Sequence, residues 1–247
     1  MFCKILFFLP VLFYLCTGTP LCKVDLDSGD IYYKVFEDKK AFNFYSKALT
    51  RCPDYESLMK TTRALIDIGE DVSGKEKSTY FAQALTYTDS LQKKYPDSLQ
   101  SYFLKAAAAG NLALYKGGKA KIELARTIES NVKKALLIDS SYAPAHVVLG
   151  VYYRQVATIN KLSKAIVKAM YGKIPDGTLK GSERELKKAL NLDNQNIFGH
   201  YELAQTYYLM NRIKEAKEQL QIVLTLPNSN NQAGQIKKSA KQMLKKW

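Results

Sequence analysis

Two histidines, His146 and His200, are the residues with the widest choice of chemistry in this chain. An imidazole binds zinc readily, and its change of charge near neutral pH suits it to proton transfer. Both tasks need supporting groups, and the sequence has no Cys-x-x-Cys spacing of the kind that holds a metal. Each histidine instead stands three residues before a leucine, Leu149 or Leu203, in two similar stretches. We therefore predict that both histidines pack inside the fold and that the chain has no metal site.

Other catalytic patterns are incomplete as well. Gly117-Gly118-Lys119 shares residues with a phosphate-binding loop, but the upstream glycine and the Ser or Thr after the lysine are missing. The chain has no nucleophile elbow, no dinucleotide-binding fingerprint and no pair of acids with supporting groups. We predict a protein that is not an enzyme, has no catalytic residues and uses no cofactor.

The segments that carry the histidines are two copies of one unit, 132–153 and 186–208. Lys-Lys-Ala-Leu, an aspartate, a histidine, a leucine and a tyrosine recur in the same order, and His146 and His200 are 54 residues apart. Apolar residues at helical spacing precede and follow the aspartate in each copy. Each unit is therefore predicted to contain two helices joined by a short polar turn.

Small residues recur where two helices of such a unit would approach closely: Ala135, Gly150, Ala189, Ala204 and Ala216. One helical hairpin cannot bury both of its faces, so hairpins of this kind must stack into a superhelix.

This unit resembles the tetratricopeptide repeat, which has a period of 34 residues. The last copy fits the consensus best, through Leu203, Ala204, Tyr207, Ala216, Leu220 and Val223. Earlier segments match the second helix of the repeat and its closing proline, through Ala41, Tyr45, Ala48 and Pro53, and again through Ala84 and Pro96. The resemblance implies an all-α solenoid of helical hairpins over residues 31–247.

The distance between the two copies exceeds one period by about 20 residues, which places an insertion at about 154–181. Its first part keeps helical spacing up to about Met170, which predicts one unusually long helix. Proline and glycine in Ile174–Gly177 predict a turn. Ser182 with Glu185 predicts a capping box at the start of the next helix.

This order of features resembles the bacterial relatives of the regulator of microtubule dynamics family. The likeness is clearest over 132–227 and rests on the Pro-x-Gly element of the insertion and on a closing helix of the 212–217 type followed by Leu-Pro. It implies a helical scaffold without known catalytic residues. A microtubule role is not expected to carry over, because an exported chain would not meet tubulin.

A superhelix exposes the first helix of each hairpin along a concave groove. The consensus spacing places six residues there: Val151, Arg154 and Gln155 in one copy, and Tyr201, Gln205 and Tyr208 in the next. Tyrosine beside arginine and glutamine suits an extended peptide or a partner helix. We predict a non-catalytic scaffold that binds a protein or peptide partner in this groove.

The N-terminus is predicted to be a signal peptide, residues 1–18, followed by a linker, residues 19–30. Lys4 precedes an apolar run from Ile5 to Leu15 that is too short to cross a bilayer comfortably. We expect an exported protein, periplasmic or secreted. Two alternatives stay open: a lipoprotein signal and an uncleaved anchor, either of which would attach the chain to a membrane.

Two cysteines, Cys22 and Cys52, lie beyond the expected cleavage point. In an oxidising compartment they could pair as a disulfide. Two free thiols are an equal alternative on the sequence alone.

The chain is basic, with a formal net charge of +14, but its lysines are spread along the sequence. Such spacing is typical of solvated helix surfaces, and no motif for specific nucleic-acid binding accompanies it. Two further functions stay open: a ligand-handling accessory of a solute transporter, and a lysine-driven binder of an anionic polymer or membrane surface. Homo-oligomerisation is also left open.

Overall fold

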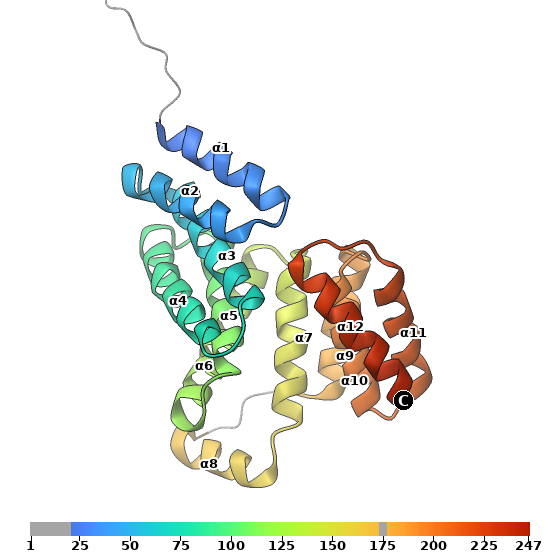
Figure 1. Ribbon diagram of the computed structural model, residues 1–247. Coiled ribbons are helices and arrows are strands. Elements are labelled where there is room, and N and C mark those ends of the chain that lie inside the picture. Colours follow the sequence, from blue (N-terminus) through green and yellow to red (C-terminus); the bar gives the residue numbers. More distant parts are fainter. Residues whose placement is uncertain (1–20, 173–176) are drawn as a thin grey trace, which may run out of the picture.

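The computed structural model describes residues 21–172 and 177–247, and these residues form helices joined by short turns (Figure 1). The helices are α1 Leu21–Lys34, α2 Asp38–Arg51, α3 Tyr55–Asp71, α4 Glu76–Lys94, α5 Leu99–Ala113, α6 Gly118–Ile138, α7 Ala143–Ala157, α8 Lys161–Tyr171, α9 Leu179–Leu192, α10 Ile197–Leu209, α11 Ile213–Thr225 and α12 Asn231–Lys246. The all-α class predicted from the sequence is confirmed. Within the described residues, no helix is long and apolar enough to cross a membrane.

Hairpins stack in chain order to make a solenoid. The hairpins are α1 with α2, α3 with α4, α5 with α6, α7 with α9, and α10 with α11, and α12 follows the last of them. The first helices of successive hairpins also touch, from α3 to α5, α7 and α10, and α10 in turn touches α12. We call these five the inner helices. The helix α12 returns to contact α3, so the row of inner helices closes on itself (Figure 1).

The small residues of the repeat lie where the helices meet, as the sequence predicts. Ala135, Ala189, Ala204 and Ala216 have no exposed surface. A Cβ atom added to Gly150 would lie 2.6 Å from Cγ of Leu186 on α9, so only glycine lets α7 and α9 approach this closely. These contacts account for the tight packing of the α7–α9 hairpin.

Polar side chains start several of the helices. Asp54, Asn160 and Asn196 accept a hydrogen bond from a backbone N–H in the first turn of α3, α8 and α10. Such caps satisfy amide groups that a helix end leaves without an internal partner. The turns between helices can therefore be short.

The insertion departs from the prediction in two ways. The expected long helix is interrupted, because α7 ends at Ala157 and α8 begins after Asn160, which caps it. The cap of α9 is Thr178, one turn before the predicted Ser182, which is buried inside the helix and hydrogen-bonded to Thr206 at 2.9 Å. The predicted turn at 174–177 lies largely outside the described residues.

The N-terminal boundaries also change. Residues 21–30, predicted as part of a linker, belong to α1, whose Cys22 and Leu26 pack on α2. Cys22 forms a disulfide with Cys52 at the end of α2, with the two Cα atoms 6.0 Å apart. The predicted signal peptide lies outside the described residues.

Candidate functional site

The two histidines are buried and bridge neighbouring segments. His146 contacts Glu185 on α9 through Nδ1 at 2.9 Å, and its Nε2 lies 3.0 Å from the carbonyl oxygen of Ser140. His200 repeats this with Gln219 on α11 at 2.7 Å and with the carbonyl oxygen of Asn194 at 3.1 Å. Each ring thus ties a first helix to its partner helix and to the turn before it. This is the packing role that the repeat predicts.

The predicted groove residues of α7 are divided between interior and surface. Arg154 is only 5% exposed and forms an ion pair with Glu202 on α10, which is as deeply buried. Burial raises the pKa of Glu202 and the guanidinium of Arg154 opposes that rise. Val151 packs on the cluster between α7 and α9, whereas Gln155 is exposed. Arg154 therefore holds two inner helices together.

The predicted groove residues of α10 lie on one face of that helix. Gln205 donates a hydrogen bond to Glu202 at 3.0 Å. Tyr201 packs on a cluster that includes Ala233 and Ala240 of α12. The ring of Tyr208 stacks on Trp247, with centroids 4.1 Å apart and planes 8° apart. The C-terminal helix therefore supports both tyrosines from one side.

Two residues that the sequence prediction omitted extend this face. Phe198 is 42% exposed and Leu209 is 46% exposed, close to the 44% of Tyr208. Their spacing from Tyr201 and Gln205 puts them on the same side of the helix, a signal that was present in the sequence. We call Phe198, Tyr201, Gln205, Tyr208 and Leu209 the α10 strip. The ion pair to α7 and the contacts to α12 fix its two flanks.

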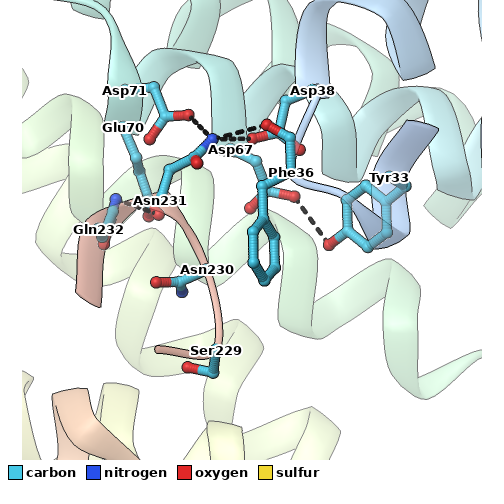
Figure 2. A pocket seen from close by; sticks show the side chains of 10 residues that line it. All are labelled: Tyr33, Phe36, Asp38, Asp67, Glu70, Asp71, Ser229, Asn230, Asn231 and Gln232. Atoms are coloured by element: carbon cyan, nitrogen blue, oxygen red, sulfur yellow. Dashed lines mark hydrogen bonds between the residues drawn. The ribbon is translucent and has the colours of Figure 1, made fainter. Parts of the chain in front are cut away.

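A cavity lies where α12 meets α3 (Figure 2). The cavity has a volume of about 160 Å³ and is lined by Tyr33, Phe36, Asp38, Asp67, Glu70, Asp71, Ser229, Asn230, Asn231 and Gln232. The amide of Asn231 donates to Asp71 at 2.5 Å, to Asp38 at 3.1 Å and to the carbonyl oxygen of Phe36 at 2.9 Å. Gln232 donates to Glu70. Two amides at the start of α12 thus bind carboxylates of the N-terminal hairpins.

Crowding and burial disfavour charge on these carboxyl groups. Burial raises the pKa of Asp67 to about 8 and that of Glu70 to about 7. Burial together with neighbouring Asp71 raises the pKa of Asp38 to about 6. Tyr33 donates a hydrogen bond to Asp67 at 2.9 Å. Among the described residues, no group of three or more His, Cys, Asp or Glu side chains is arranged to hold a metal ion.

Comparison with known proteins places the chain in a family. The model of the family described as Regulator of microtubule dynamics protein 1-3 matches residues 25–247. This chain belongs to that family. It is 24% identical over 226 residues to regulator of microtubule dynamics protein 1 of Bos taurus, an alignment that covers 89% of this chain and 70% of the relative.

Two further proteins are similar to this chain, one in sequence and one in structure. Regulator of microtubule dynamics protein 3 of Rattus norvegicus is 23% identical over 75% of this chain, and the match spans 40% of that relative. The crystal structure of a thermophilic TPR protein of Thermus thermophilus superposes with a TM-score of 0.65 at 22% identity, over 90% of this chain and 99% of that one. The tetratricopeptide-like solenoid is thus confirmed.

Proposed function

We propose that this protein is a scaffold that binds a segment of another protein along the α10 strip. One observation carries the proposal: three aromatic side chains, a leucine and a glutamine share one face of an inner helix, and three of them keep more than two fifths of their surface exposed. Large apolar side chains on a rigid support are the groups that contribute most to protein interfaces. The strip is held rigidly because α7 and α12 flank it.

The chemistry of the strip defines the partner. Phe198, Tyr208 and Leu209 offer apolar area, and Gln205 offers an amide between them. A peptide with two or three apolar anchors, either extended or helical, would cover this surface and place polar backbone groups near the amide. The strip carries no charged side chain, so binding there should change little with salt concentration.

The test uses variants that leave the frame of the solenoid intact. Phe198→Ala and Leu209→Ala remove exposed area and spare the stack of Tyr208 on Trp247. A photo-crosslinking residue in place of Phe198 should capture a partner from an extract of the native host, and mass spectrometry would identify the captured segment. The purified segment should then bind the intact chain at least tenfold more tightly than the double variant, because two interface anchors together contribute about 2 kcal/mol or more.

The matched control is Leu137→Ala on α6, which removes another exposed leucine, 85% exposed, away from the strip. Its affinity for the segment should equal that of the unchanged chain. Equal affinities for all three proteins would contradict binding at the strip.

We also propose that the chain is exported. The apolar run after Lys4 supports this, and so does the disulfide of Cys22 with Cys52, because disulfides persist mainly in oxidising compartments. Fractionation of the native host, followed by N-terminal sequencing, should find a chain that begins near residue 19 outside the cytosol. A cytosolic chain with an intact N-terminus and two free thiols would contradict export.

A further inference from the structure

The helix α8 is an addition to the repeat architecture. It lies in the insertion between α7 and α9, and the solenoid stacks through α7 and α9 without it. In Figure 1 it occupies one edge of the molecule, apart from the stacked hairpins. Val167 is the only buried residue of its first nine. Packing alone therefore does not explain why this segment is helical and apolar.

The outer surface of α8 combines two kinds of side chain. Leu162 is 73% exposed and Ile166 is 47% exposed, and the helical spacing puts Ala165 and Ala169 beside them. Lys161 and Lys168 are also exposed, and they lie along the edge of this outer surface that is opposite Ile166. Lys164, which is half-buried, lies one helical turn from Lys161 and from Lys168. We call Lys161, Leu162, Lys164, Ile166 and Lys168 the α8 ridge.

Negative charge is missing from this part of the chain. The sequence has no Asp or Glu from residue 140 to 175, nor from 98 to 122, although the whole chain has 23 acidic residues. Within the part of the chain that the structure describes, no ion pair involves a lysine of α8. The ridge is therefore a local cationic surface, unlike the helices whose lysines pair with acids four residues away, as Lys133 pairs with Glu129.

The connection between α5 and α6 has the same composition. Leu114 is 66% exposed and Tyr115 is 44% exposed, and Lys116 follows them. Ile159, just before α8, and Leu124 of α6 both pack against the cluster that α5, α6 and α7 share. Both segments lie on one edge of the molecule in Figure 1. Exposed apolar groups and lysines thus recur at this edge.

We propose that the α8 ridge docks the protein on the surface of a bilayer that contains anionic phospholipid. A short basic amphipathic helix lies in the headgroup region with its apolar side chains directed toward the acyl chains and its lysines at the phosphates. Nucleic acid offers phosphates but no apolar layer for Leu162 and Ile166. In Figure 1 α8 lies at an outer edge of the molecule, where a flat bilayer can approach it. This inference is independent of the partner that the α10 strip binds.

A local reporter tests the proposal in the full-length chain. Trp247 is the only tryptophan, so Leu162→Trp adds one reporter at the ridge, and the unchanged chain gives the background. Vesicles of phosphatidylcholine with phosphatidylglycerol should shift the added emission to the blue, and brominated acyl chains should quench it. Unshifted and unquenched emission at low salt would overturn the proposal, even if residues 1–20 attach the chain to the vesicles.

Charge variants measure the electrostatic part. Each lysine near an anionic surface strengthens binding roughly fivefold, so Lys161→Gln, Lys164→Gln and Lys168→Gln together should weaken the titration of the reporter on the order of 100-fold. The control replaces three lysines elsewhere, Lys188, Lys214 and Lys241, by glutamine and removes the same net charge.

Four outcomes decide between the alternatives. A large loss with the ridge variant and a small loss with the control would support docking through α8. Equal losses would overturn it in favour of diffuse attraction. Equal binding to pure phosphatidylcholine would also overturn it. Reporter signals that appear with an oligonucleotide and not with vesicles would assign the ridge to nucleic acid instead.

Discussion

The two copies of the repeat differ at one equivalent position. In each copy this position lies where the inner helix, α7 or α10, meets the inner helix that follows it. In the first copy this residue is Arg154, buried and paired with Glu202 of α10. In the second copy it is Tyr208, which is 44% exposed and stacked on Trp247 after α12. Arg154 thus binds the next inner helix, and Tyr208 binds the residue that ends the next inner helix. The repeat thus determines which position makes this contact, and the neighbour determines its chemistry.

This comparison separates an internal copy from a terminal one. The α7 face is covered by α10, so a charged side chain there requires a buried partner. The α10 face meets the last helix, α12, and part of this face stays in contact with solvent, as the exposure of Tyr208 shows. We therefore expect the contact in the first copy to contribute more to stability, and the corresponding face in the second copy to be available for binding.

The largest expected effect comes from breaking the buried ion pair. Glu202→Ala leaves the guanidinium of Arg154 buried without a counter-charge, and should lower the free energy of unfolding by about 3–5 kcal/mol. Urea denaturation would measure this. The double variant Arg154→Met with Glu202→Met should regain most of the loss, because it leaves no unpaired charge. A single variant as stable as the unchanged chain would show that the pair contributes nothing.

The second effect comes from the close approach of α7 and α9. Gly150→Ala places a Cβ atom 2.6 Å from Leu186 Cγ and 3.2 Å from the carbonyl oxygen of Ser182. Overpacking of this kind should cost about 1–3 kcal/mol. The equivalent position of the second copy already holds Ala204, without exposed surface, and there the reverse change to glycine should cost about 1 kcal/mol. A stabilised Gly150→Ala variant in thermal unfolding would contradict this account.

The third effect tests the terminal copy. Trp247→Ala removes the stack on Tyr208 and should lower the free energy of unfolding by about 1.5 kcal/mol, the upper range for an aromatic pair. Trp247→Phe should restore most of it. Because α12 then supports the α10 strip less well, the affinity for a partner segment should fall along with stability. A loss as large as that of Glu202→Ala would remove the distinction between the copies.

The smallest effect concerns Asp38, one of the carboxyl groups that line the cavity at the start of α12. The folded state holds the pKa of Asp38 near 6, above its ordinary value near 4, so the folded state binds the proton more tightly than the unfolded chain does. The contribution of Asp38 to the free energy of unfolding is therefore fully present at low pH, and it is lost as the pH rises through about 6. Asp38→Asn should therefore stabilise the protein by about 1 kcal/mol at pH 8, after allowance for solvent screening.

Unfolding curves at pH 4 and pH 8 would check this expectation. The advantage of the Asp38→Asn variant should shrink toward zero at pH 4, where the aspartate itself is largely protonated. An advantage that grows on acidification would have the opposite sign and would contradict the assigned cause.

The sequence predicts the repeat because its information is local. Small residues such as Ala189 and Ala216 mark helix contacts wherever they recur, and the shared place of His146 and His200 indicates packing. Local patterns also led to two wrong predictions, one for a helix break and one for a helix cap. Apolar spacing through residues 154–170 concealed the break at Asn160, whose capping side chain starts a new helix. Thr178 and Ser182 both have the chemistry of a cap, and only the buried contact of Ser182 with Thr206 decides between them.

The cavity between α3 and the start of α12 could not be predicted from the sequence. Its residues come from the N-terminal hairpins and from the start of α12, and Asn231 lies 160 residues from Asp71. Their meeting depends on the curvature summed over every hairpin between them, which no local pattern records. The site prediction had a similar limit: consensus spacing selected one face of α10, but the buried partner of Arg154 is visible only in three dimensions.

The return of α12 to α3 has a consequence for how the molecule unfolds. Each unit of an open solenoid depends only on its neighbours, so the array frays from either end without affecting the other. Here the last helix binds the first hairpins, and loosening one terminus removes contacts from the other. Hydrogen exchange should therefore show linked protection of α3 and α12, and Asn231→Ala should raise the exchange rates of both. The protein would then open as one cooperative unit, in contrast to a row of independent hairpins.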